Sequence, residues 1–128
     1  MTQPIIVPRI QMRIDGQKPI AASGKSFDIY EWRGSGPGYL HVHHNDDEAW
    51  HVLEGTLVFR FNDRTVEAPA GTTVFVPAGV PHTYFADSSA RYLMILTPRL
   101  RELIAALHAA PFEQHKEVML RYDSEILE

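Results

Sequence analysis

The sequence predicts an all-β domain, either a closed antiparallel barrel or a jelly-roll sandwich, followed by a short helical tail. Two observations lead to this fold class. The central part of the chain is a succession of short runs rich in Val, Ile, Phe, Tyr and Thr, about ten residues apart and separated by turn residues. After Pro98 the apolar spacing changes from that of a strand to that of an amphipathic helix.

The predicted strands alternate with recognisable turns. The pattern is clearest where Leu57, Phe59 and Phe61 alternate with Val58 and Arg60, as in a strand with one buried face. The predicted strands cover residues 12–14, 27–32, 39–43, 48–53, 56–61, 72–76, 83–85 and 92–96. The turns between them contain Asp15-Gly16, residues 34–38, residues 45–47, Gly55 and Asn62-Asp63.

The predicted tail begins with an amphipathic helix that ends near Pro111. Its apolar residues recur at helical spacing, at Leu100, Leu103, Ile104 and Leu107. Residues 113–121 predict a second, weaker helix. His108 and His115 fall on this tail, and we expect both of them to be exposed to solvent.

The composition excludes several classes of function. The 128 residues include 12 Lys or Arg and 16 Asp or Glu, and the net charge of −4 argues against a nucleic-acid or anionic-membrane partner. The absence of cysteine excludes disulfides, iron–sulfur clusters, thiolate zinc sites and cysteine nucleophiles. No targeting or membrane-spanning segment is recognisable, so we expect a soluble cytoplasmic protein.

A cluster of histidines points to a metal site. His41 and His43 point to the same face of a strand because side chains alternate, so their imidazoles can bind one ion. Glu48 can add a carboxylate from the next strand, and His82 can add a third imidazole from a later strand. Two further histidines have the opposite parity and are expected to point away, His44 and His51.

These residues resemble the two sequence motifs of the cupin superfamily. The first motif is a His-x-His pair, three or four residues, Glu, six residues and Gly; this chain has His41-x-His43, four residues, Glu48, six residues and Gly55. The second motif is Gly, five residues, Pro-x-Gly, two residues, His, three residues and Asn; this chain has Gly71, five residues, Pro77-x-Gly79, two residues and His82. The fifteen residues between Gly55 and Gly71 are typical of small single-domain bacterial cupins.

The chain departs from these motifs at two positions. Ser35 stands where the first motif begins with glycine, and Ala86 stands where the second motif closes with asparagine. Both positions belong to turns or supporting contacts, so they bear on loop geometry more than on metal binding.

The resemblance implies a fold, a cofactor and an assembly. The fold would be one antiparallel double-stranded β-helix, or jelly-roll barrel, over residues 1–128, with N-terminal strands in 1–26, the barrel core in 27–97 and the helical tail in 98–128. The cofactor would be one divalent transition metal ion, with Fe, Mn, Ni, Co, Cu and Zn all open, bound by His41, His43, Glu48 and His82. The resemblance also implies a homodimer.

The expected surroundings of the metal suit a small molecule with an anionic oxygen. Three neutral imidazoles and one carboxylate leave a bound divalent ion with net positive charge and with open coordination positions. Strand parity places four aromatic residues beside this site as candidate walls of a substrate pocket, Tyr39, Trp50, Phe59 and Tyr84. Asp46 and Asp47 are expected in a solvated turn, which leaves Glu48 as the candidate catalytic residue for proton transfer.

Three functions are compatible with this site. The leading hypothesis is an oxygen-dependent dioxygenase, similar to quercetinase-like cupins, acting on an aromatic or enol-type small molecule. The first alternative is a non-redox metal-dependent isomerase or lyase that acts through an enolate. The second alternative is a protein that binds a metal or a ligand without catalysis.

Overall fold

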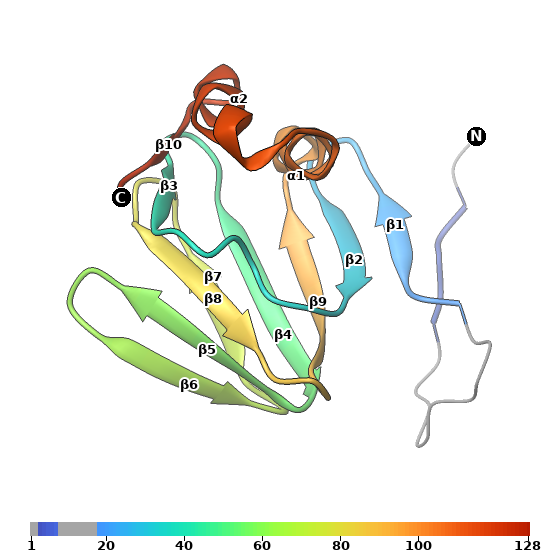
Figure 1. Ribbon diagram of the computed structural model, residues 1–128. Helices are drawn as coiled ribbons and strands as arrows, with labels where there is room; N and C mark the ends of the chain where they lie inside the picture. The colour runs from blue at the N-terminus through green and yellow to red at the C-terminus, as the bar shows by residue number, and fades with distance from the viewer. Residues whose placement is uncertain (1–2, 8–17) are drawn as a thin grey trace.

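The computed structural model describes residues 3–7 and 18–128, and Figure 1 shows two facing β-sheets with helices across one end. The strands are β1 Ala21–Ser23, β2 Asp28–Trp32, β3 His41–His43, β4 Glu48–Glu54, β5 Thr56–Phe61, β6 Thr65–Pro69, β7 Thr73–Val76, β8 His82–Ala86, β9 Arg91–Leu96 and β10 Ser124–Ile126. The helices are α1 Pro98–Ala109 and α2 His115–Arg121, joined through the short 3-10 turn η1 Phe112–Gln114.

The described strands form two five-stranded sheets. One has the order β1-β2-β9-β4-β7 and the other the order β10-β3-β8-β5-β6. Every strand pair within the described residues is antiparallel, and the chain crosses from one sheet to the other between β2 and β3 and again between β3 and β4. The prediction of an all-β jelly roll with a C-terminal helical tail is therefore confirmed.

The structure also refines the predicted elements. The strand predicted at residues 12–14 lies outside the described residues. β1 falls in the region where N-terminal strands were expected but no range was given, and two other strands were not predicted, β6 and β10. The first reads Thr-Val-Glu-Ala-Pro, where Pro69 weakens the strand signal, and the second has only three residues, which is too short for alternation to be recognised.

The core lies between the two sheets and beneath α1. The fully buried side chains of Trp50 and Val52 on β4 face those of Leu57 and Phe59 on β5, as period-two alternation requires. The buried face of α1 adds the predicted leucines, Leu100, Leu103 and Leu107. Burying a leucine or phenylalanine side chain contributes roughly 1.5–3 kcal/mol. None of these core side chains belongs to the cluster of buried histidines.

The start of α1 is tied to the loop that precedes β4. Thr97 caps the helix by accepting a hydrogen bond from the Leu100 N–H at 3.1 Å, and Pro98 occupies the first turn. Asp46 is buried and accepts hydrogen bonds from the Thr97 hydroxyl and from Arg99 Nε, both at 2.9 Å. The expectation of a solvated Asp46 was wrong, because the helix packs over a turn that looks exposed in the sequence.

Within residues 3–7 and 18–128, no helix is long and apolar enough to span a membrane. The cytoplasmic location stays a prediction.

Candidate metal centre

Three imidazoles meet inside the sandwich. His41 and His43 come from β3 and His82 from β8, where the antiparallel register places the Cα atoms of His41 and His82 opposite each other. One ring nitrogen from each of the three side chains lies within 4.8 Å of the others, and all three residues are buried. The structure thus brings together the three histidines that the sequence predicted as metal ligands.

Each imidazole is oriented by a hydrogen bond at its Nδ1 atom. The Nδ1 of His41 lies 3.2 Å from the Tyr39 carbonyl oxygen, and the Nδ1 of His82 lies 2.9 Å from the Val80 carbonyl oxygen. Carbonyl oxygens only accept, so both Nδ1 atoms carry the hydrogen and both Nε2 atoms of the neutral rings carry a lone pair.

The third imidazole is held by a serine from the far end of the chain. The Nδ1 of His43 lies 2.7 Å from Ser124 Oγ, and this hydroxyl donates its own hydrogen to the Tyr122 carbonyl at 3.1 Å. Ser124 Oγ therefore accepts from His43, and the Nε2 of His43 is also left with a lone pair. All three rings thus present the nitrogen that a metal ion needs.

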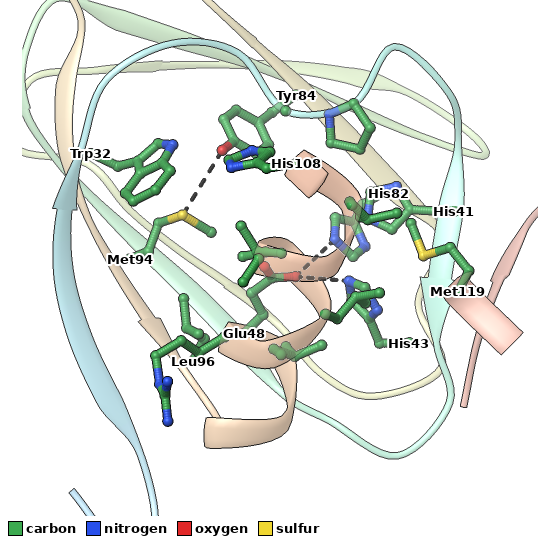
Figure 2. A pocket seen from close by; sticks show the side chains of 18 of the residues that line it. Trp32, His41, His43, Glu48, His82, Tyr84, Met94, Leu96, His108 and Met119 are labelled. Carbon is green, nitrogen blue, oxygen red and sulfur yellow. Dashed lines mark hydrogen bonds and ion pairs between the residues drawn. The ribbon is translucent and has the colours of Figure 1, made fainter. Parts of the chain in front are cut away.

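Glu48 completes the donor set. Its Oε1 atom lies 3.1 Å from His82 Nε2 and 3.4 Å from His43 Nε2, and Figure 2 shows the carboxylate directed toward these two rings. Burial by itself would raise the pKa of the Glu48 carboxyl, but in the metal-free site the hydrogen bonds that His43 and His82 donate when their Nε2 atoms are protonated outweigh burial and hold the pKa below its usual range. The carboxylate is therefore ionised. A metal ion bound at Nε2 would take the place of that proton.

This donor set fits a divalent transition metal. Three imidazole nitrogens can hold such an ion, and the ionised Glu48 offers an oxygen beside two of them. The rings are pre-oriented by the Nδ1 hydrogen bonds, as is usual for histidines that bind metal. Mixed nitrogen and oxygen ligation does not select one metal, so the identity of the ion stays open.

A cavity of about 440 Å³ opens onto these four residues. Its walls are mostly aromatic and aliphatic, and Figure 2 shows Trp32, Tyr84, Met94, Leu96 and Met119 around it. Of the four predicted pocket residues, Tyr39, Trp50 and Tyr84 line the cavity. Phe59 does not line it, because it is fully buried behind Trp50 and Tyr84, with ring centroids 5.0 and 5.5 Å away.

The sequence motifs, the fold and the metal centre agree with a comparison with known families. The family model described as "Cupin domain" matches residues 29–96, which is more than half of the chain. The chain belongs to the cupin family.

Solved cupin-like structures have the same fold. A cupin-2 domain containing protein from Shewanella frigidimarina has 27% sequence identity and a TM-score of 0.51, covering 61% of this chain and 78% of that one. Protein NMB1881 from Neisseria meningitidis has 20% identity and a TM-score of 0.53, covering 67% and 88%. KdgF from Halomonas sp. has 17% identity and a TM-score of 0.52, covering 63% and 76%. The last two likenesses show the fold alone, and no curated protein matches the chain significantly.

The two departures from the cupin motifs contact each other. The Ala86 N–H donates a hydrogen bond to Ser35 Oγ at 2.9 Å, so the serine hydroxyl joins the loop before β3 to the end of β8. The neighbouring Gly36 packs against the Tyr84 ring so closely that a Cβ atom there would lie 2.6 Å from Tyr84 Cε1. The departures therefore leave the wall of this cupin's cavity intact.

The C-terminal helices supply a wall of the cavity that the sequence did not predict. His115 is half-buried and lines the cavity from α2, so the expectation that it is exposed was wrong. His108 is exposed, as expected, but it also lines the cavity and stacks on Trp32 with ring centroids 5.9 Å apart. The remaining α1 and α2 residues of this wall are Leu100, Arg101, Leu103, Ile104, Ala105, Leu107 and Met119. The apolar stripe of α1 indicated in the sequence that one face of this helix is buried. It did not indicate that this face covers the cavity.

The histidines of opposite parity point away from the centre. His44 is exposed and lies 3.1 Å from Glu125 Oε1, and the Nδ1 of His51 lies 2.8 Å from the Thr73 hydroxyl. Alternation along β3 and β4 therefore separates the candidate ligands from their neighbours.

Acid is expected to release a metal ion from this cupin. Burial, and then the neighbouring His82 and His43, lower the pKa of His41 to about 3, so His41 stays neutral in mild acid. Burial would lower the pKa of His82 too, but its hydrogen bond to Glu48 outweighs burial and raises it. One proton at His82 then competes with the metal, and affinity is expected to fall about tenfold per pH unit below that raised pKa.

Zinc titrations of the protein at about pH 8 and about pH 5.5 measure this effect. An affinity that is the same at both values would contradict ligation by His82.

Proposed function

We propose that this cupin is a metal-dependent enzyme for a small molecule, and specifically a dioxygenase for an aromatic or enol-type substrate. One observation carries the proposal: the mostly apolar cavity of about 440 Å³ opens directly onto the three histidines and Glu48. A cavity of this size is in the range of small-molecule sites, and its aromatic walls suit a flat apolar ligand.

The metal ligands and the cavity walls would have different roles in this function. A metal ion held by His41, His43, His82 and Glu48 would supply open coordination positions for an anionic substrate oxygen and, when redox-active, for dioxygen. Tyr84 can orient an aromatic substrate with its ring, and the fully buried Trp50 supports that ring edge to face, with ring centroids 5.4 Å apart. The mostly apolar walls would replace water over the part of the substrate that they contact.

Glu48 is the candidate general base. Among the described residues that line the cavity, it provides the only carboxylate, and this carboxylate is ionised and lies beside the metal centre, where it can accept a proton from a bound substrate. A dioxygenase incorporates both atoms of dioxygen into its product, and the substrate itself is oxidised. The reaction therefore needs no external reductant.

Metal analysis followed by oxygen uptake tests this function. Protein purified without a metal-affinity column or chelator is expected to carry about one transition metal ion per chain. Loaded protein is then expected to consume oxygen with aromatic diols or enols. At matched metal occupancy, Glu48→Gln is expected to lower this rate about 100-fold or more, because a positioned general base contributes at least that much.

The other outcomes would replace the proposal with a named alternative. Conversion of substrate under anaerobic conditions by the zinc-loaded protein would indicate an isomerase or lyase. Binding of aromatic compounds with no conversion under either condition would indicate a ligand-binding cupin. Failure to take up any metal would contradict an enzyme of this type.

We also propose that the protein forms a homodimer through the outer face of the sheet that contains β1. The strand register places Ile29, Ile95, Ala49 and Phe75 in one row across this face, and the Phe75 side chain is 62% exposed. A second copy can bury the same row about a two-fold axis, which removes apolar surface from water in both chains.

Size-exclusion chromatography coupled to light scattering tests this dimer. The wild-type protein is expected to be a dimer and the Phe75→Glu variant a monomer, because the substitution places a charge in the apolar row. A monomeric wild-type protein would contradict the proposal.

A further inference from the structure

A tyrosine and a histidine from opposite ends of the chain meet in the wall of the cavity. The hydroxyl oxygen of Tyr39 lies 3.0 Å from Nδ1 of His115, the first residue of α2. Both side chains line the cavity, and Tyr39 is almost fully buried. The Tyr39 ring also packs against the His41 ring with centroids 5.9 Å apart, so the pair lies beside the metal centre without belonging to it.

The backbone of the helical tail determines which atom of this pair carries the hydrogen. The Nε2 of His115 lies 3.0 Å from the Leu107 carbonyl oxygen and 3.1 Å from the Ala110 carbonyl oxygen. Carbonyl oxygens only accept, so Nε2 of the neutral ring carries the hydrogen and Nδ1 has the lone pair. Nδ1 therefore accepts the hydrogen of the Tyr39 hydroxyl.

This arrangement leaves the Tyr39 oxygen with acceptor capacity only. A phenolic hydroxyl has one hydrogen, and here that hydrogen is directed to His115. The remaining lone pair is available to a donor inside the cavity. A buried acceptor favours a ligand that supplies a hydrogen and discriminates against one that does not, because an unpaired buried polar group costs free energy.

We propose that Tyr39 contacts the substrate by accepting a hydrogen bond from a substrate hydroxyl group, and that His115 is the positioning residue that holds the Tyr39 hydroxyl in this orientation. This inference rests on the proposed function and narrows its substrate class. The substrate would be an aromatic or enolic compound with one oxygen at the metal centre and a second, free hydroxyl at Tyr39.

Binding of two matched probes to the zinc-loaded protein tests the contact. Catechol has two hydroxyl groups, whereas 2-methoxyphenol carries a methyl group in place of one hydroxyl hydrogen. Calorimetry is expected to show that Tyr39→Phe weakens catechol binding about tenfold, the value of one net hydrogen bond, and leaves 2-methoxyphenol binding within about twofold. The ratio of the two affinities within one variant cancels any general loss of folded protein or of zinc.

Substitutions of His115 separate positioning from simple anchoring of the tail. His115→Leu is expected to lower the catechol preference as Tyr39→Phe does. His115→Asn is expected to restore most of it, because the Asn side-chain oxygen can accept the Tyr39 hydrogen near the position of Nδ1. His51→Gln, on the outer face of β4, is the matched control and is expected to change neither affinity.

Two results would overturn the inference. Equal weakening of both probes, or of neither, in Tyr39→Phe would show that the pair only fastens α2 to the sheet. Nitrogen-15 NMR of the neutral His115 ring is expected to show the hydrogen on Nε2, and a hydrogen on Nδ1 would reverse the assigned orientation. Failure of the wild-type protein to bind either probe would instead contradict the aromatic substrate class of the proposed function. Failure of the Tyr39 contact and failure of the proposed function therefore give different results.

Discussion

Replacing His82 by alanine is expected to lower the affinity of the protein for a divalent transition metal by at least about 100-fold, since loss of even a hydrogen-bond partner of a ligand costs about 10–100-fold. The Nε2 of His82 faces Glu48 at 3.1 Å, and its Nδ1 is hydrogen-bonded to the Val80 carbonyl, so the ring is held with Nε2 directed into the site. The change removes one of the three imidazoles that the structure brings together.

The variant is expected to fold, because the main core between β4, β5 and α1 is apolar and contains none of the metal ligands. Zinc titration measures the affinity, and far-ultraviolet circular dichroism checks the fold. His51→Ala removes an imidazole from the outer face of β4 and is expected to bind metal as the wild-type protein does. Full metal occupancy in His82→Ala would show that His82 is not a ligand.

The second large effect is expected at Gly55, in the turn between β4 and β5. Its φ angle is +70°, in the left-handed region that favours glycine. A Cβ atom would lie 2.7 Å from both the Cα and the N of Ala90, which are backbone atoms of the turn before β9. Gly55→Ala therefore adds backbone strain and overpacking, and is expected to lower the free energy of unfolding by about 2–5 kcal/mol.

Gly71 provides a matched control in the same protein. Its φ angle is +91°, but a Cβ atom there would meet nothing within 4 Å. Gly71→Ala therefore carries the backbone strain alone, about 1–2 kcal/mol. Urea unfolding of the two variants measures the difference, and equal destabilisation would show that the backbone near Ala90 moves aside without cost.

The metal ligands could be predicted because alternation along a strand is a local property. His41 and His43 are two residues apart, so they share a face wherever the strand lies in the fold. The same rule separates His44 and His51 from the site, and the structure places both of them outward. The resemblance to the cupin motifs supplied what alternation cannot, namely that His82 on a distant strand joins the pair.

The support of the site could not be predicted in the same way. Ser124 orients His43 across a separation of 81 residues, and it does so because the three-residue strand β10 pairs with β3. His115 reaches Tyr39 across 76 residues, and Asp46 is buried because α1 packs over its turn. β10 is too short to show the alternation of a strand, and residues so far apart in the sequence have no periodic relation that would indicate their contact.

The sequence therefore determined the all-β class, the inward face of the strands and the helical stripe of the tail, and its resemblance to the cupin motifs supplied the jelly-roll fold and the full set of candidate metal ligands. The first three follow from side-chain periods of two and 3.6 residues, which depend only on neighbouring positions. The last two follow from the spacing of the motif residues between His41 and His82. The tertiary structure decided that the tail closes the cavity, that His115 holds Tyr39, and that Phe59 lies behind the wall and not in it. The physical reason is that a contact between segments far apart in the sequence depends on the packing of many side chains from both segments. A local sequence pattern contains no information on that packing.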